Sequence, residues 1–313
     1  MASASSKKVI FAALTANGLI AVSKFAAAAY TGSSAMLSEA IHSVVDTGNQ
    51  GLLLYGGKRA AKPADANHPF GYGMELYFWT FVVAILIFAG GSGISIYEGI
   101  EKIRFPHAVS NVTVNYVVLA LALVFEAYAW SVAYREFRRT DQRRGFLRAI
   151  RRSKDPTIFT VLFEDTAAVL GLLVAFTGIF LAETLELPVL DGVASIGIGV
   201  ILAITAALLA YECKGLLIGE AAQPDTVRGI GEIVAADPRI TQTNEILTLH
   251  FGPTDVLLNI SLDFVDSIGA DEVERAISQL EIEIKGKYPE ITRVFIEAQS
   301  RAGHQRALAA GGK

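Results

Sequence analysis

The sequence has few of the residues that bind metals or form disulfides in small soluble domains. Its 313 residues include one cysteine, Cys213, and five histidines. A single cysteine excludes an intramolecular disulfide framework and any CxxC metal knuckle. Metal or redox chemistry would therefore have to use histidine and carboxylate side chains.

Charged residues are also scarce, and neither sign dominates. Asp, Glu, Lys and Arg make up 19% of the chain, hydrophobic residues make up 52%, and the formal net charge is −4. The sequence has no global basic field and no zinc-finger or RNA-recognition motif, which argues against nucleic-acid binding. So hydrophobic a composition is typical of a membrane protein rather than a soluble one.

Six hydrophobic stretches follow one another along the first two thirds of the chain. Each has the length of about 20 residues that a helix needs to cross roughly 30 Å of hydrocarbon. The first stretch has no small-residue cleavage site before its end, so we interpret it as a retained membrane helix and not as a signal peptide. The sequence predicts an α-helical membrane domain with spans at about 8–30, 33–57, 74–101, 111–135, 156–182 and 187–212.

The basic residues of the loops predict on which side of the membrane each loop lies. The loop after the fourth stretch carries nine Lys or Arg residues between Arg135 and Lys154, whereas the loop after the fifth, AETLELP, has none. Because cytoplasmic loops are enriched in Lys and Arg, we expect the basic loop and both termini in the cytoplasm. Anchoring to anionic lipid explains this loop better than a nucleic-acid arm does. Without an extended amphipathic presequence, the chain fits a bacterial inner membrane better than an organelle.

The sequence changes character after Gly219, where hydrophobic runs shorten to strand length and prolines become frequent. Apolar and polar residues alternate along 257–264, which is typical of a half-buried strand, and a helical stripe of apolar residues follows at 273–284. We expect a small α+β domain of αββαβ order. The predicted domains are the six-helix membrane domain at 1–218, the cytoplasmic α+β domain at 219–300 and a disordered tail at 301–313.

Several ionisable side chains lie inside the predicted spans, where each costs about 2.5–3.5 kcal/mol to insert and by default faces a bundle interior or an aqueous path. His42 and Asp46 are four residues apart, so they share a helix face and can reach one ion. At 1.5 Å per residue, Asp46 and Asp165 lie about 16 Å and 14 Å from the cytoplasmic boundary, a matching depth that suits a shared site. The alternative is a buried polar pair that only holds helices together. The ionisable residues in the spans are Lys24, Glu39, His42, Asp46, Glu126, Glu164 and Asp165.

Three segments carry a resemblance to a known family: SSAMLSEAIHSVVDTGNQ at 33–50, PADANHPFGYG at 63–73 and SKDPTIFTVLFEDTAAVLG at 153–171. On these motifs the chain resembles the cation diffusion facilitator family, and specifically its zinc transporter nine-like branch. The resemblance implies a homodimer with six spans and a cytoplasmic ferredoxin-like domain. It also implies export of Zn²⁺ or related divalent ions in exchange for protons.

The resemblance assigns His42 and Asp46 to the transport site on the second span and Asp165 to an acidic ligand on the fifth. The usual family pattern has another ligand four residues before that acid, where this chain has Val161. Glu164 shares a helical stripe with both positions, so it is the candidate fourth ligand. If Glu164 points away, three protein ligands and water form the site.

Two further places are weaker candidates for metal binding. Asp65 and His68 occupy positions that bind a second ion in some relatives, with Tyr72 as the third partner here; the alternative is a helix-linking turn. In the α+β domain, the polar candidates do not reproduce the histidine cluster of metal-loaded relatives, and we expect that domain to serve dimerisation. These candidates are His250, Asp263 and Glu297.

The sequence therefore predicts a secondary active transporter that exports Zn²⁺ in exchange for protons, with His42, Asp46, Glu164 and Asp165 as ligands. One imidazole with carboxylates also suits Mn²⁺ or Fe²⁺, so the choice of ion stays open. The alternative function is a transport-incompetent scaffold or regulator in the lipid bilayer. An intramembrane metalloenzyme is not expected because the HExxH motif is absent, and no cofactor is expected beyond the transported ion.

Overall fold

The computed structural model describes residues 4–140 and 154–311, and these residues form two compact units. One unit comprises Met1–Lys58 and Glu75–Lys214, and we call it the helical unit. The other comprises Arg59–Met74 and Gly215–Lys313, and we call it the α/β unit. The loop that contains the NHPFGYG motif thus belongs to the α/β unit and not to the helices that it connects.

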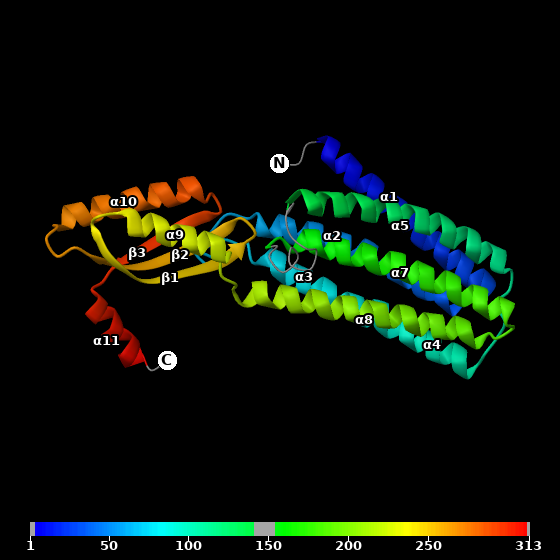
Figure 1. Ribbon diagram of the computed structural model, residues 1–313. Helices are drawn as coiled ribbons and strands as arrows, with labels where there is room; N and C mark the ends of the chain where they lie inside the picture. The colour runs from blue at the N-terminus through cyan, green and yellow to red at the C-terminus, as the bar shows by residue number, and fades with distance from the viewer. Residues whose placement is uncertain (1–3, 141–153, 312–313) are drawn as a thin grey trace. The chain divides into compact units, whose positions relative to one another are not determined.

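Long helices build the helical unit, and α1, α5 and α7 lie side by side in it (Figure 1). The third predicted span is one helix with a π-helical turn, η1, in its middle. The helices are α1 (Ala4–Thr31), α2 (Ser34–Ala60), α3 (Glu75–Leu86), η1 (Ile87–Gly93), α4 (Ile94–Arg104), α5 (Val112–Thr140), α7 (Pro156–Thr184) and α8 (Val189–Ile218).

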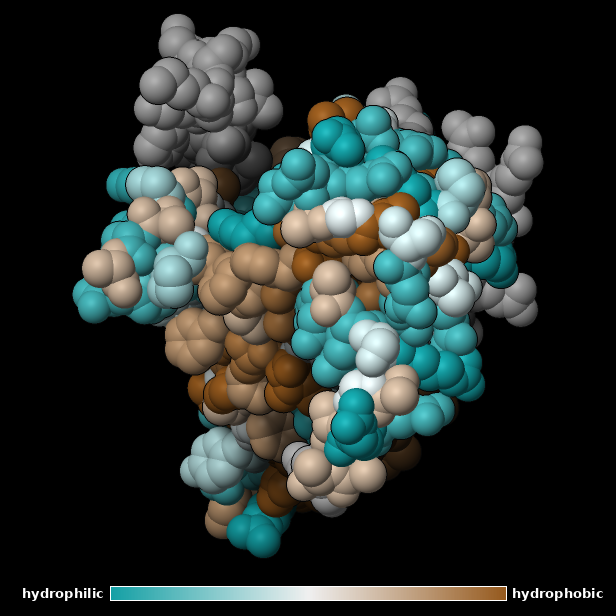
Figure 2. All heavy atoms as spheres, turned by 90° about the vertical axis from the view of Figure 1, so that its left-hand side faces the viewer, coloured by the Kyte–Doolittle hydropathy of each residue, from teal (hydrophilic) through white to brown (hydrophobic). Residues whose placement is uncertain are grey.

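Four helices among the described residues are long and apolar enough to cross a membrane. Apolar side chains lie open on their surfaces, as the 66% exposure of Leu121 and the 71% exposure of Val124 show, and Figure 2 shows hydrophobic side chains at the molecular surface. Such a surface calls for a hydrocarbon environment. The chain is therefore a membrane protein. The four helices are Glu75–Arg104, Val112–Arg135, Pro156–Thr184 and Val189–Ile218.

Carboxylates that accept hydrogen bonds from backbone N–H groups mark where two of the helices begin. The carboxylate of Asp155 accepts a hydrogen bond from the backbone N–H of Thr157 at 2.9 Å, and Pro156 occupies the first turn of α7. Both are common helix-start features. The start of α2 is capped from another helix, because the buried carboxylate of Asp191 on α8 accepts from the backbone N–H of Ser34 at 2.8 Å.

The helices α4 and α8 approach each other at glycines. A Cβ atom added to Gly99 would lie 2.6 Å from the carbonyl oxygen of Gly192, and one added to Gly192 would lie 2.8 Å from the carbonyl oxygen of Gly99. Small residues at a crossing allow membrane helices to pack through their backbones. This contact holds the end of the bundle at which α2 begins, because Asp191 is the neighbour of Gly192.

The α/β unit has the predicted αββαβ order. Its sheet has the strand order β1–β2–β3, in which β2 pairs antiparallel with β1 and parallel with β3. The alternate residues Leu258, Ile260 and Leu262 of β2 are fully buried in the core, as the alternation predicts. The elements are α9 (Pro224–Ala236), β1 (Ile240–Gly252), β2 (Asp255–Phe264), α10 (Ala270–Lys287), β3 (Ile291–Ala298) and α11 (Arg301–Gly311).

Residues 301–311, where the sequence predicts disorder, form helix α11, and the other two residues of the predicted tail, 312 and 313, lie outside the described part of the chain. The hydroxyl of Ser300 accepts a hydrogen bond from the backbone N–H of Gly303 at 3.2 Å. The carboxylate of Asp263 accepts from the backbone N–H of Arg301 at 2.9 Å. These two oxygens satisfy N–H groups of the first turn, which is how a short polar helix is stabilised at its start.

Candidate functional site

A cavity of about 490 Å³ lies within the helical unit between α1, α2, α5 and α7. Four carboxylates line it: Asp46 from α2, Glu126 from α5, and Glu164 and Asp165 from α7. The residues that the structure describes on its wall include no lysine and no arginine. Carboxylates in a confined space with low-dielectric walls concentrate cations. The cavity is therefore suited to a positively charged ligand.

Two residues from separate helices meet at this cavity as their depth suggests. Asp46 and Asp165 are far apart in the sequence, yet both line the same space. Val161 and Glu164 line it too, so the stripe of α7 that contains Asp165 faces the cavity. Glu164 thus points toward the space that Asp165 faces, and not away from it.

His42 and Asp46 approach each other on α2. The Nε2 atom of His42 lies 3.4 Å from the Oδ2 atom of Asp46, and the imidazole is almost completely buried. Both ring nitrogens of His42 and the Oδ1 atom of Asp46 lack a hydrogen-bond partner within the described part of the chain. Buried polar atoms normally have partners. These atoms are therefore available to a proton, a water molecule or a cation, although His42 itself is not part of the cavity wall.

Glu164 is held by Asn49, a residue for which the sequence predicts no role of its own. The side-chain amide of Asn49 donates to the Oε1 atom of Glu164 at 2.7 Å, and this contact joins α2 to α7. The carbonyl oxygen of the Asn49 amide is buried and has no hydrogen-bond partner among the described residues. Asn49 follows Asp46 by three residues and His42 by seven, so helical spacing places all three on one face of α2.

The four predicted ligands are not arranged around one point in this structure. Among residues 4–140 and 154–311, no group of three or more His, Cys, Asp or Glu side chains is arranged to hold a metal. The cavity gathers three of the predicted ligands, and the fourth, His42, contacts Asp46.

The loop candidates Asp65 and His68 form a turn. One carboxylate oxygen of Asp65 accepts from the backbone N–H groups of Asn67 and His68 at 2.9 and 2.8 Å, and the other accepts from the hydroxyl of Tyr72 at 2.7 Å. The hydrogen bond from Tyr72, followed by those from the backbone, lowers the pKa of Asp65. Because both oxygens are engaged, the geometry favours the helix-linking turn over a second ion site.

The candidates in the α/β unit have separate structural partners. The Nδ1 atom of His250 lies 3.0 Å from the carbonyl oxygen of Gly252, and Asp263 accepts from the start of α11. With Glu297 they form no metal-binding group within the described residues.

The NHPFGYG loop packs on the same unit, since Phe70 stacks on Phe251 with ring centroids 5.0 Å apart and the guanidinium of Arg293 lies over Phe70.

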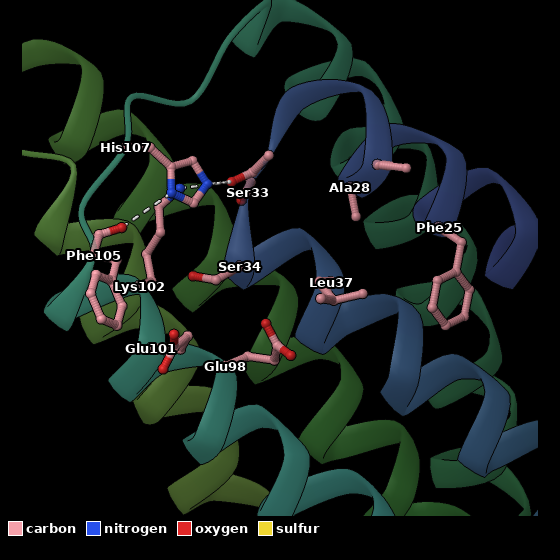
Figure 3. Close-up of a pocket in the computed structure, with 12 residues that line it drawn as sticks. Phe25, Ala28, Ser33, Ser34, Leu37, Glu98, Glu101, Lys102, Phe105 and His107 are labelled. Carbon is pink, nitrogen blue, oxygen red and sulfur yellow. Dashed lines mark hydrogen bonds between the residues drawn. The ribbon is translucent and has the colours of Figure 1, made fainter.

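A second cavity of the helical unit, of about 520 Å³, lies at the turn between α1 and α2 (Figure 3). The ammonium of Lys102 donates to the carbonyl oxygen of Gly32 at 2.7 Å and lies 3.5 Å from Asp191. The Nε2 atom of His107 lies 3.1 Å from the same carbonyl oxygen. Figure 3 shows both side chains reaching the turn from α4 and the segment that follows it. We interpret this cluster as an anchor for the start of α2.

Comparison with known proteins agrees with the cation-binding chemistry of the four-carboxylate cavity. Residues 10–218 match the family described as the cation efflux transmembrane domain. Over 259 residues the chain is 36% identical to the mitochondrial proton-coupled zinc antiporter SLC30A9 of Mus musculus, and the match covers 82% of this chain and 46% of that protein. The Homo sapiens protein of the same name is 35% identical over 259 residues. This chain thus spans about half the length of these relatives.

A bacterial relative matches over nearly its full length. The cation-efflux pump FieF of Escherichia fergusonii is 26% identical over 283 residues, which cover 90% of this chain and 89% of that protein. The cation efflux domain spans the helical unit and both helices that supply the predicted ligands. The prediction from the sequence motifs is confirmed, and the chain belongs to the cation diffusion facilitator family.

Proposed function

We propose that this protein is a secondary active transporter that exports a divalent cation, Zn²⁺ first, from the cytoplasm in exchange for protons. The observation that carries the proposal is the cavity lined by Asp46, Glu126, Glu164 and Asp165. Four carboxylates with no basic side chain described on the wall attract a divalent ion and can each also take up a proton. The names of the relatives support the same chemistry, since one is a proton-coupled zinc antiporter and another a cation-efflux pump.

We propose His42, Asp46, Glu164 and Asp165 as the ligands of the transported ion. Zn²⁺ binds imidazole nitrogen and carboxylate oxygen, usually in a four-coordinate arrangement. Ion binding requires movements that bring His42 and the two carboxylates of α7 around one point. Mn²⁺ and Fe²⁺ accept the same donor atoms, so these ions compete as substrates. Ligands must lose their protons before they coordinate, so metal and protons compete for the same groups and the ion is released when protons arrive.

The proposal includes an architecture for the whole protein. The helices α1 and α2, of 28 and 27 residues, complete a set of six spans with the four apolar helices. The α/β unit is a cytoplasmic ferredoxin-like domain that serves a homodimer. The Lys and Arg residues of the loops support a cytoplasmic position for both termini. A bacterial inner membrane is the proposed location, although the relatives include a mitochondrial protein as well as bacterial pumps.

Flux measurements on the reconstituted protein test the proposal. In proteoliposomes with an imposed pH gradient, Zn²⁺ should move against the proton flow, and each cation of a panel with Mn²⁺ and Fe²⁺ should be scored by its own flux. Apparent affinity should fall as the pH is lowered, because protonated ligands do not coordinate. Glu101→Gln is the matched control for substitutions of the carboxylates that line the four-carboxylate cavity, since this exposed carboxylate lies on α4 at the other cavity. A protein that binds lipid and folds but shows no metal-dependent proton flux would instead be a scaffold or regulator.

A further inference from the structure

A buried ion pair joins α1 to α2 beside the four-carboxylate cavity. The Nζ atom of Lys24 lies 3.0 Å from the Oε2 atom of Glu39, and both side chains are 0% exposed. Burying two charges costs free energy that their attraction often fails to recover, so such a pair is weak evidence for a role in stability. Ionisable groups inside a membrane domain more often mark the path of a substrate.

Ser43 connects this ion pair to the cavity. The ammonium of Lys24 donates a second hydrogen bond to the Oγ atom of Ser43 at 2.8 Å. Ser43 lines the cavity together with Asp46, three residues further along α2. The positive charge of Lys24 therefore lies one hydroxyl group away from the wall that the transported ion faces.

Glu39 holds the ammonium with only part of its carboxylate. Its Oε1 atom is buried and has no hydrogen-bond partner among the described residues. That oxygen lies against Gly171 of α7, where a Cβ atom would collide with it. Gly171 thus leaves room for a charged group between α2 and α7. The attachment of Lys24 is divided between two acceptors, Glu39 on one side and Ser43 on the cavity side.

We propose that Lys24 is a tethered counter-cation that sets the affinity of the cavity for its divalent ion, and that Glu39 and Ser43 fix how close the ammonium stands. The proposal rests on the transport function proposed above, and in it Lys24 and Glu39 tune the affinity for the ion without coordinating it. A fixed positive charge near the cavity weakens the binding of a dication and speeds its release. The negative charge of Glu39 offsets part of this repulsion.

The two partners of the pair therefore act in opposite directions. Lys24→Met removes a positive charge at nearly constant length, so the KM for Zn²⁺ should fall by about tenfold and the maximal rate should fall as release slows. Glu39→Gln removes the offsetting charge and leaves the ammonium to Ser43, so the KM should rise by about tenfold. The double variant restores the balance of charge, and its KM should lie within about threefold of the parent protein.

The experiment measures Zn²⁺ flux against Zn²⁺ concentration for the full chain in proteoliposomes, and Zn²⁺ binding by calorimetry in detergent. Lys102→Met is the matched control, because Lys102 is also a buried lysine paired with a carboxylate of the helical unit, Asp191, but lies at the other cavity. This control should lower the yield or the melting temperature without moving the KM. Ser43→Ala keeps both charges and should lower the KM about threefold, as Lys24 draws back toward Glu39.

If the KM for Zn²⁺ shifts in the same direction in Lys24→Met and Glu39→Gln, or changes in neither, the proposed role of Lys24 as a counter-cation is wrong. A purely structural ion pair would give the same loss of stability whichever partner is replaced. If a single variant does not fold, the decision passes to Ser43→Ala and to the double variant, and an unchanged KM in Ser43→Ala rejects the proposal. A parent protein that neither binds nor transports Zn²⁺, Mn²⁺ or Fe²⁺ would instead reject the transport function itself.

Discussion

The helical unit and the α/β unit bury different kinds of side chain. The core of the α/β unit consists of apolar residues from α9, β2, α10 and β3, such as Ile230, Ile260 and Leu280. The helical unit buries charged groups as well, including Lys24 and Glu39. Among the described residues, the ionisable side chains with buried atoms that lack a hydrogen-bond partner, Glu39, His42 and Asp46, all lie in the helical unit.

This difference indicates where stability and function reside. Burial of apolar side chains stabilises the fold by about 25 cal/mol per Å² of area removed from water, without selecting any ligand. Buried carboxylates and an imidazole whose atoms lack hydrogen-bond partners lower the stability of the fold, and the same atoms can bind a charged ligand. We therefore expect substitutions in the two units to separate, with loss of stability from one and loss of transport from the other.

The largest effect should come from removing a single carboxylate of the cavity. Asp165→Asn keeps the size of the side chain but removes the charge that attracts and coordinates the cation. Zn²⁺ flux in proteoliposomes should fall by more than about 100-fold, since the neutral amide of asparagine binds the cation more weakly than the carboxylate that it replaces. The melting temperature should stay the same or rise, because a buried charge has been removed. Flux equal to the parent protein would remove Asp165 from the ligand set.

The opposite result is expected in the core of the α/β unit. Ile260 is fully buried on β2, so Ile260→Ala should destabilise this unit by about 2–5 kcal/mol through lost burial and the cavity left behind. Hydrogen exchange of the β2 amides measures that loss, and Zn²⁺ affinity of the folded fraction should not change. Leu247→Ala on β1 is the control, because Leu247 is 51% exposed and its loss should cost less than about 0.5 kcal/mol. A change of Zn²⁺ affinity in Ile260→Ala would contradict the separation of the two units.

The sequence predicts those parts of the molecule that follow from local periodicity. Hydropathy predicts the positions of the long helices that the structure describes, and the alternation at 257–264 predicts β2 with its buried face, because each depends only on residues close in sequence. The helical start at Ser300 also has a local signal, a serine that can cap, but the composition of the tail obscured it. The pattern of His42 and Asp46 predicts one shared face for the same local reason.

Contacts between helices could not be predicted in this way. The hydrogen bond from Asn49 to Glu164 spans 115 residues, and the ion pair of Lys24 with Glu39 depends on how α1 and α2 pack. The spacing places Asn49 on the face of Asp46 but does not say what faces it across the cavity. Membership of the NHPFGYG loop in the α/β unit likewise depends on tertiary contacts such as the stacking of Phe70 on Phe251.

An intermediate effect should come from Asn49, which holds Glu164 but does not line the cavity. Asn49→Ala removes the hydrogen bond that orients the carboxylate, so the KM for Zn²⁺ should rise by about tenfold while the maximal rate changes little. In the Glu164→Ala background the same substitution should have no further effect, because the hydrogen bond between the two side chains is already lost. Leu54→Ala is the control on α2, because Leu54 is exposed and does not line the cavity. Additive losses in the double variant would show that Asn49 acts on packing alone.

The smallest effect should come from the loop of the α/β unit, where Asp65 is half-exposed and its carboxylate accepts three hydrogen bonds. The pKa of Asp65 lies below its ordinary value of 3.8, chiefly because of the hydrogen bond from Tyr72. The folded loop therefore favours the ionised carboxylate, which stabilises the loop above about pH 3.8 and loses that effect as the pH falls through the lowered pKa. Hydrogen exchange at the amides of Asn67 and His68 should show protection at neutral pH that decreases below this range.

Two variants of this loop decide between the turn and an ion site. Asp65→Ala should abolish the protection of the Asn67 and His68 amides at every pH, and Tyr72→Phe should abolish only part of it, because one of the three hydrogen bonds is lost. Neither variant should change the stoichiometry of Zn²⁺ binding, since the lone pairs of Asp65 serve the turn. Loss of one bound Zn²⁺ per chain in Asp65→Ala would show that the loop also binds an ion, and the assignment of ion binding to the helical unit alone would then be wrong.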